Sequence, residues 1–222
     1  MNPLSIGDEI NFKTLELRKG EIYKIGSTQI ITVVEGQVRD RVKGILNTFE
    51  SSVYYGGEIE ATNNTLITIF DIKNKDIILN KIDVNGNFGE YCRKNWTQLR
   101  GLYDIEGFEK IDLYRGNQID YSFNGVKYKF NLWFCGKEVD CLWHNQHSFI
   151  ETHTNIAGDG YMQKSLDGTD NGLIETVGLL PGNSHKKFNI DGENEENGNP
   201  KYPFHRWLGG SSGNIWLVIE KY

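Results

Sequence analysis

Alternating apolar and polar positions run along most of the chain, and they predict β-strands more often than helices. In the first half, β-branched and aromatic residues gather in short runs separated by turn residues such as Glu35-Gly36 and Gly56-Gly57. These runs are 21–25, 29–34, 37–38, 47–55 and 65–72. The Asn85-Gly86 pair is typical of a β-hairpin turn. We therefore expect an all-β first half, with the run 65–72 as its clearest strand.

The alternation loosens between residues 90 and 103, where Trp96, Leu99 and Leu102 follow each other at helical spacing. This segment favours a short helical connector. Strand-like runs resume after the Asn124-Gly125 turn at 126–134, 149–156, 161–166, 173–180 and 214–220. Residues 191–201 are polar and predict an exposed loop. The pattern divides the chain into a β unit at 1–90, a connector at 91–119 and a second β unit at 120–222.

An internal repeat relates the two units. Six residues separate Gln29 from Gly36, and six separate Glu151 from Gly158. Later in each unit, segment 57–64 matches segment 182–189 in its Gly and Asn positions, and one strongly apolar strand follows. Because these correspondences occur in the same order, they favour a duplicated β unit.

Composition narrows the class of protein. The chain has 222 residues, 38% of them hydrophobic and 12% aromatic, with 25 glycines, which suits one large or two small β units. Asp and Glu outnumber Lys and Arg by 30 to 24, and this excess disfavours a nucleic-acid partner. No apolar run approaches the ~20 residues that a membrane helix needs. The first residues lack a secretory signal pattern, and three cysteines without CxxC spacing indicate no disulfide framework, so we expect a cytoplasmic protein.

Histidine is confined to one part of the sequence. All five histidines fall between positions 144 and 205; they are His144, His147, His153, His185 and His205. Neutral imidazole is the commonest metal ligand, and together with a carboxylate it suits Zn, Fe, Ni or Mn. Glu151 lies among them, and a buried carboxylate without a cation would be costly. We therefore expect one divalent transition metal, held within a β-barrel.

These positions resemble the cupin superfamily. Cupins carry a first motif of two histidines, then a glutamate and a glycine, and a second motif of Pro and Gly followed by a histidine and an asparagine. His147, Glu151 and Gly158 fit the first motif, and Pro181, Gly182, His185 and Asn189 fit the second. The resemblance implies a double-stranded β-helix, or jelly-roll barrel, and a bicupin whose N-terminal copy is degenerate. It also implies a possible homodimer.

Two ligand registers fit this resemblance. The paired histidines of cupins are separated by one residue, whereas His144 and His147 are separated by two, so His144 needs a bulge or a strand end to point inward. The alternative set is Glu151, His153 and His185, because Glu151 and His153 do have the one-residue spacing. In the N-terminal unit the matching positions are Tyr23, Ile25, Gln29 and Glu60, which offer no imidazole.

Other residues are candidates for chemistry or for substrate binding. Glu151, His153 and His205 are the candidate catalytic residues, and His205 could close either metal site. Arg206 could bind a carboxylate bidentately, although a surface ion pair is the simpler interpretation. The other candidate substrate-binding residues are Tyr161, Gln163 and Trp207; aromatic residues are more often packing than sugar-stacking surfaces.

The predicted function is that of a metal-dependent cupin enzyme. Its substrate would be a small polar metabolite, such as a sugar, sugar acid or oxo acid, in an isomerase, epimerase, lyase or dioxygenase reaction. The alternative is a non-catalytic cupin module that binds a small ligand such as a saccharide. The histidines could also be hydrogen-bonded core residues of a barrel that has lost its metal, because a fold does not determine its chemistry.

Overall fold

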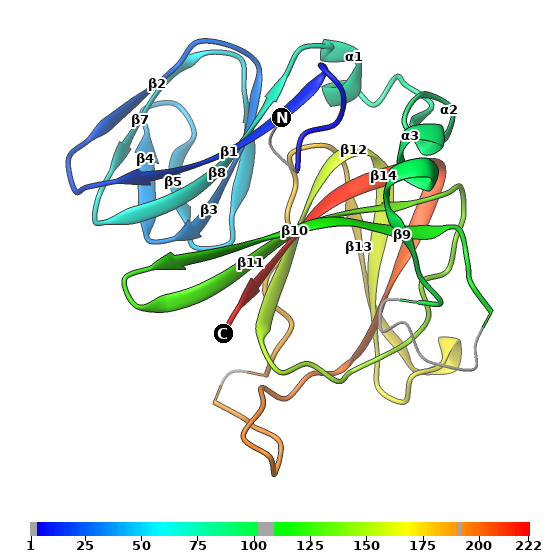
Figure 1. Ribbon diagram of the computed structural model, residues 1–222. Coiled ribbons are helices and arrows are strands. Elements are labelled where there is room, and N and C mark those ends of the chain that lie inside the picture. The colour runs from blue at the N-terminus through cyan, green and yellow to red at the C-terminus, as the bar shows by residue number, and fades with distance from the viewer. Residues whose placement is uncertain (1–3, 102–108, 191) are drawn as a thin grey trace.

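The computed structural model describes residues 4–101, 109–190 and 192–222, and their architecture is mostly β (Figure 1). The N-terminal part holds two four-stranded sheets, in the orders β1-β8-β3-β6 and β2-β7-β4-β5. Their strands are β1 (Ile10–Leu17), β2 (Ile22–Ile25), β3 (Gln29–Glu35), β4 (Gln37–Asp40), β5 (Gly44–Asn47), β6 (Ser51–Tyr54), β7 (Gly57–Ala61) and β8 (Thr65–Ile72). All pairings within these sheets are antiparallel.

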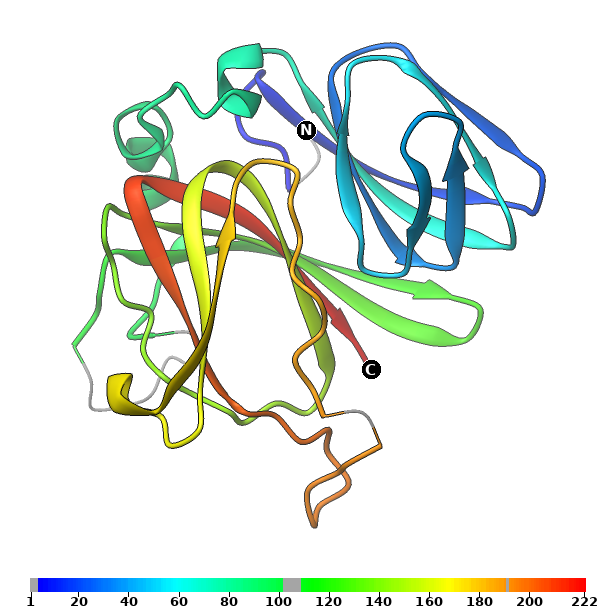
Figure 2. The ribbon, with the colours of Figure 1, turned by 180° about the vertical axis from the view of Figure 1, so that it is seen from behind.

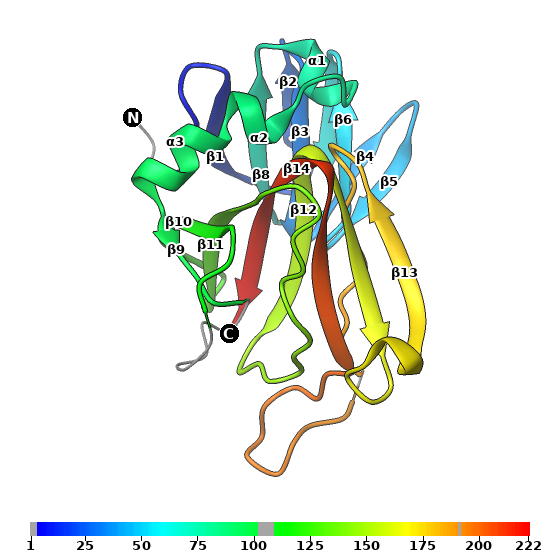
Figure 3. The ribbon, with the colours of Figure 1, turned by 90° about the vertical axis from the view of Figure 1, so that its right-hand side faces the viewer.

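The C-terminal part is built on one six-stranded sheet in the order β13-β12-β14-β11-β10-β9. Its strands are β9 (Thr97–Gln98), β10 (Leu113–Phe123), β11 (Val126–Cys135), β12 (Ile150–Ser165), β13 (Leu173–Leu179) and β14 (Phe204–Lys221). The two longest strands, β12 and β14, pair along most of their length, with register shifts near Asn155 and Gly158. These irregularities let both strands bend, and Figures 2 and 3 show them curving around the interior of this part.

Short helices connect the two parts along one side of the molecule (Figure 3). Within the described residues they are α1 (Lys75–Ile78), α2 (Val84–Asn87) and α3 (Gly89–Asn95). Asn74 caps α1 by accepting a hydrogen bond from the Asp76 N–H. A further single turn, η1 (Asp170–Gly172), precedes β13. Among the described residues, no helix is long and apolar enough to cross a membrane.

Three layers of apolar side chains explain why the central strands are hydrophobic on both faces. On β3, Ile31 and Val33 pack inside the N-terminal pair of sheets, whereas Ile30 and Val34 pack toward the C-terminal part. On β14, Trp216 and Val218 face the interior of the C-terminal part, whereas the alternate residues of that strand face the N-terminal part. Since strand side chains alternate, the middle layer joins the two parts into one core.

The two parts share one pattern of strand pairing. β8 lies between β1 and β3, and the second half of β14 lies between β11 and β12. In register, Gln29 of β3 is opposite Asp71, and Glu151 of β12 is opposite Glu220. In the N-terminal part, β3 is followed by an antiparallel pair, β4 and β5. In the C-terminal part, the first half of β12 is likewise followed by an antiparallel pair, formed by the second half of β12 and β13.

Several of the predicted runs match described strands closely, and others differ from them. Runs 29–34, 65–72, 126–134 and 173–180 coincide with β3, β8, β11 and β13 to within one residue at either end. Runs 149–156 and 161–166 form one continuous strand, β12, because Gly158 and Gly160 kink the strand without ending it. The alternation missed β1, β7, β9, β10, most of β5 and the first half of β14. Within run 47–55 only Ser51–Tyr54 forms a strand of its own, β6.

The other differences lie between residue 85 and the start of β10 at Leu113. Asn85-Gly86 is not a hairpin but the middle of α2, where the Asn87 N–H donates to Asp83 O at 2.8 Å. The helix predicted near Trp96 exists as α3 but ends at Asn95, and Leu102 lies outside the described residues. β10 begins at Leu113, inside the segment expected to be a connector, and continues into the second unit.

Candidate metal centre

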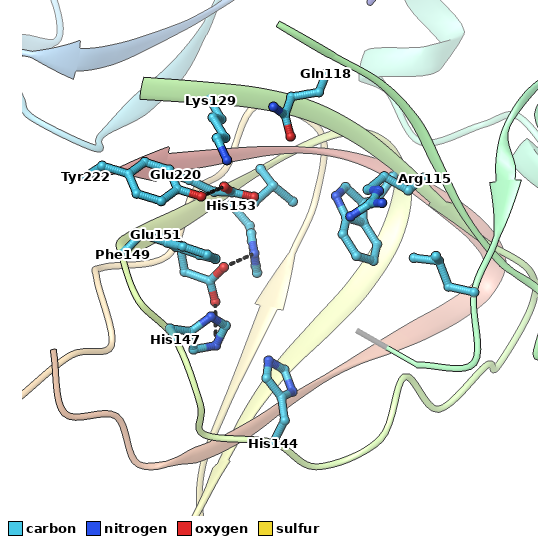
Figure 4. A pocket seen from close by; sticks show the side chains of 13 residues that line it. Arg115, Gln118, Lys129, His144, His147, Phe149, Glu151, His153, Glu220 and Tyr222 are labelled. Carbon is cyan, nitrogen blue, oxygen red and sulfur yellow. Dashed lines mark hydrogen bonds and ion pairs between the residues drawn. The ribbon is translucent and has the colours of Figure 1, made fainter. Parts of the chain in front are cut away.

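A cavity of about 280 Å³ opens onto one face of the six-stranded sheet (Figure 4). Most of the side chains that line it are polar or aromatic, and most come from β10, β11, β12, β14 and the loop before β12. Its lining residues are Leu99, Arg115, Gln118, Lys129, Trp133, His144, His147, Phe149, Glu151, His153, Val218, Glu220 and Tyr222. Three of the five histidines therefore border one space.

Strand alternation places two of these side chains together. Glu151 and His153 are two residues apart on β12, so both point to the cavity face, and both are buried. Tyr202 fixes the start of this strand: its hydroxyl accepts the Glu151 N–H at 2.9 Å and donates to Phe149 O at 3.1 Å. The carboxylate of Glu151 is thus held at the edge of the cavity by the backbone and by a buried phenol.

His144 and His205 are brought together by their own backbones. The His144 N–H donates to His205 O at 3.0 Å, and the His205 N–H donates to His144 O at 2.8 Å. Their rings lie 4.2 Å apart between centroids. Leu142, two residues before His144, has a φ of 68°, and this kink ends the extended run before the bridge. The first residues of β14 and the irregular loop around His144 thereby bring two imidazoles close together.

Four donor groups converge there. His144, His147, Glu151 and His205, here called the His/Glu cluster, each offer one ligand atom, and these atoms lie within 4.8 Å of one another. His147 Nε2 is 3.0 Å from His205 Nε2. Glu151 Oε1 is 3.4 Å from His147 Nε2 and 3.3 Å from His205 Nε2. Ligands of one ion at bond lengths of about 2.0–2.2 Å stand roughly 3–4.4 Å apart, so the three separations among His147, Glu151 and His205 fit a shared cation.

Hydrogen bonds at the far side of the rings orient the nitrogens. His205 Nδ1 lies 2.9 Å from Pro203 O, and His144 Nδ1 lies 3.4 Å from Leu142 O. A carbonyl oxygen only accepts, so each Nδ1 carries the proton and the Nε2 of the neutral ring keeps its lone pair. The His205 Nε2 lone pair faces Glu151 and His147. Such second partners fix the tautomer of metal-binding histidines.

Burial sets the charges of the cluster. It lowers the pKa of His147 to about 4, against the opposing effect of Glu151, and it lowers the pKa of His144 well below the ordinary range. Burial also opposes ionisation of Glu151, but its interactions with His147 and His153 outweigh that effect and hold its pKa well below the ordinary value. At neutral pH His144 and His147 are therefore neutral imidazoles beside one carboxylate, which are ligand types that divalent transition metals prefer.

His153 and His185 have different roles from the cluster. His153 Nε2 lies 3.6 Å from the other oxygen of Glu151, Oε2, and its ring borders the cavity. His185 makes two backbone hydrogen bonds: Nδ1 donates to Lys186 O at 2.7 Å, and Nε2 accepts the His153 N–H at 3.2 Å. Both nitrogens of His185 are thus occupied, and its ring stacks on Phe188.

The cluster contains most of the first sequence register and only Glu151 of the second. It contains His144, His147 and Glu151 from the first register, but His205 takes the place expected of His185. The physical reason is the bridge between Thr154 and Ser184, which sets the segment around His185 against the backbone of β12. The kink needed to turn His144 inward is present.

The expected substrate-binding residues lie away from the cavity lining. Arg206 is held by Asp140 at 2.7 Å, Asp170 at 2.6 Å and the amide oxygen of Gln163. Tyr161 is partly exposed on β12, opposite Leu208. Trp207 is buried in the interior, stacked on Trp216 at 4.6 Å, with its ring 5.6 Å from that of His153. Their substrate-binding role stays a prediction.

Sequence reasoning missed several residues that line the cavity. Arg115 and Gln118 lie on β10, the strand that the pattern did not predict. Glu220 and Lys129 stand in register beside Glu151, on β14 and β11. Lys129 and Glu220 lie in two runs that the sequence did predict, 126–134 and 214–220. Their side chains could have been assigned to the sheet face of Glu151 if the pairing of these strands with β12 had been known.

No family model matches this chain, and no curated protein matches it in sequence. Among solved structures, it is similar to a cupin 2 conserved barrel domain protein from Leptotrichia buccalis, with 13% identity, a TM-score of 0.35, and coverage of 97% of this chain and 85% of that one. It is also similar to oxalate decarboxylase from Bacillus subtilis, with 13% identity, a TM-score of 0.37, and coverage of 96% and 68%. Likenesses this distant leave the site to be interpreted from its own geometry.

Proposed function

We propose that this chain is a metal-dependent enzyme of the cupin type that acts on a small polar metabolite. The observation that carries the proposal is the convergence of three imidazoles and the Glu151 carboxylate, with ligand atoms within 4.8 Å, at the wall of a cavity. A purely structural polar cluster would have no need of a neighbouring cavity that a small molecule can fill. Four protein ligands also leave open positions on a six-coordinate ion such as Fe or Mn.

The residues of the site have different proposed roles. His144, His147, Glu151 and His205 would hold the ion, which as a Lewis acid polarises a carbonyl or hydroxyl oxygen when bound. His153 borders the same cavity without belonging to the cluster, so it can accept or return a proton from the substrate. Trp207 packs edge-on against His153 and restrains its ring. Isomerase, epimerase, lyase and dioxygenase chemistry are all compatible with this division.

We also propose that the chain is a tandem of two cupin-like units and that only the second binds a metal. The matching strand order and the corresponding positions of Gln29 and Glu151 support this. At that place the N-terminal unit has Gln29, which donates to Asp71 and lies 3.2 Å from the Tyr23 hydroxyl. Lys13 is 3.2 Å from Asp71, so an ammonium supplies positive charge there. The first 143 residues contain no histidine.

The test is metal content and turnover measured on the same preparations. Elemental analysis of the purified protein is expected to find about one equivalent of Fe, Mn, Ni or Zn. His205→Gln should lose it, whereas the matched variant His185→Gln, also a buried histidine, should retain it. The metal-loaded protein is then assayed for isomerisation, lyase activity and oxygen uptake with sugars, sugar acids and oxo acids. Absence of metal after reconstitution would overturn the proposal, and metal without turnover would favour a binding module.

A further inference from the structure

The wall of the cavity opposite the His/Glu cluster carries two cations. Arg115 on β10 and Lys129 on β11 both line the cavity, and Figure 4 shows them across it from His144 and His147. Arg115 lies over the ring of Trp133, with 5.9 Å between the guanidinium carbon and the ring centroid. Lys129 Nζ lies 4.6 Å from the centroid of Tyr222. Both side chains are supported by aromatic rings, which leave their N–H groups available.

A β-bulge turns Arg115 into the cavity. In the pairing of β10 with β11, Arg115 is opposite Trp133 and Gln118 is opposite Asn131, so the two residues 116–117 of β10 stand opposite one residue of β11. In a regular strand, residues three apart point to opposite faces, whereas this bulge lets Arg115 and Gln118 share the cavity face. Gly116 sits in the bulge because a Cβ there would be 3.0 Å from the Trp96 ring. The local sequence is therefore suited to aiming this arginine.

Both cations interact electrostatically with Glu220, but neither forms a direct contact with its carboxylate among the described residues. Among the described residues, no hydrogen bond or ion pair to a carboxylate engages Arg115 or Lys129, in contrast to Arg206, which contacts two carboxylates. Glu220 also lines the cavity, and its carboxylate accepts hydrogen bonds from Asn131 at 3.2 Å and from the Tyr222 hydroxyl at 2.7 Å. A guanidinium at a cavity wall that forms no hydrogen bond to a carboxylate is suited to bidentate binding of an anion from solution.

The charges of the cavity lining favour the same kind of ligand. Two cations, Arg115 and Lys129, line the cavity together with two carboxylates, Glu151 and Glu220. A bound divalent ion would add two positive charges that no lining residue offsets, so the occupied cavity attracts an anion. Its volume of about 280 Å³ lies at the low end of the roughly 300–1,000 Å³ typical of ligand pockets, which limits the ligand to a small molecule.

We propose that the substrate is a small organic acid whose carboxylate binds Arg115, with Lys129 as a second positive charge, while its reacting end extends toward the His/Glu cluster. This proposal rests on the proposed function, since it assigns the substrate class of the same site. β10 and β12 are separated by two strands, about 14 Å at ~4.8 Å per strand, and the side chains from both walls shorten that gap. A molecule of a few carbon atoms spans what remains.

The test is calorimetric binding to the Mn²⁺-loaded protein. The probes are glycerate, pyruvate and malonate, with glycerol as the uncharged partner of glycerate and inorganic phosphate as a different anion. At least one carboxylate probe is expected to bind and glycerol is not. Arg115→Gln should weaken carboxylate binding by about 10- to 100-fold, the effect of losing a charge-assisted bidentate contact, and Lys129→Gln by less. Lys127→Gln, on the same strand but not lining the cavity, is the matched control and should bind as the wild type does.

The metal content of each variant distinguishes failure of the proposed carboxylate site at Arg115 from failure of the proposed metal-dependent function. Arg115→Gln with a full equivalent of metal and weakened carboxylate binding supports the inference. Equal carboxylate affinity in the wild type and Arg115→Gln would overturn it, because the metal alone would then hold the acid. Tighter binding of phosphate than of all three acids, or binding of none of them to the loaded wild type, would also overturn it. Protein that takes up no metal but binds carboxylates through Arg115 would contradict the proposed function and leave the anion site standing.

Discussion

Thr32 and Thr154 meet across the boundary between the N-terminal and C-terminal sheets, with their hydroxyl oxygens 3.1 Å apart. Each stands three residues after the corresponding polar residue of its own unit, Gln29 or Glu151. Around them, Ser51 donates to Gly182 O and Ser184 donates to Phe49 O, both at 2.8 Å. These three contacts join the two parts of the molecule by side-chain hydrogen bonds.

The contact between the two threonines predicts that the effects of substituting them on the free energy of unfolding are not additive. Both hydroxyls are fully buried, so Thr32→Val leaves the Thr154 hydroxyl without its partner and should cost about 1–3 kcal/mol of unfolding free energy. Thr154→Val should cost a similar amount. The double variant removes both polar groups and is expected to be less destabilised than the sum of the single variants. Urea unfolding of the four proteins measures this, and simple additivity would show that the hydroxyls do not interact.

Gly158, identified from its spacing to Glu151, is predicted to be intolerant of alanine. Its φ of +75° is in the left-handed region, and a Cβ would lie 2.1 Å from Gly213 O. Gly158→Ala should therefore destabilise the protein by more than the roughly 1 kcal/mol expected from the backbone conformation alone. Gly125→Ala is the control, since Gly125 has a φ of +80° but nothing within 4 Å of the added atom. Equal losses of thermal stability in the two variants would contradict the close contact.

The buried histidines predict how the stability of metal-free protein depends on pH. His147 has its pKa lowered from 6.5 to about 4, so between these values the unfolded chain binds a proton that the folded chain does not. Stability should therefore fall as the pH is lowered through this window, by up to about 3 kcal/mol for this residue. Denaturant unfolding after chelation, at pH 7 and pH 5, measures the loss. His147→Gln should show a smaller difference between the two pH values; an unchanged difference would assign the effect to other groups.

Sequence alone predicted much of the fold because alternation is strong where strands are buried on one or both faces. β3, β8 and β11 follow from their own residues, and so does the position of Glu151 beside His153. β10 was missed because its outward positions interrupt the pattern and its bulge shifts the alternation. Local rules also failed at Asn85-Gly86, where no strands flank the turn.

The sequence predicted the residue types and the region of the candidate site, but not which histidines form the cluster. Histidine clustering identified the region, and Glu151 was central to every alternative. The choice of His205 over His185 depends on the backbone bridge between His144 and His205, which joins residues far apart in the sequence. Arg115 could not be found without the strand pairing, because its side chain reaches the cavity through a bulge.

The position of the bound ion tests the central claim most directly. Crystals grown with Mn²⁺ should show a single anomalous-scattering peak within about 2.0–2.4 Å of ligand atoms from His144, His147, Glu151 and His205. The N-terminal unit should show no peak near Gln29. A peak coordinated by His153 and His185 would contradict the ligand set, and the absence of any peak in metal-saturated crystals would contradict the metal centre itself.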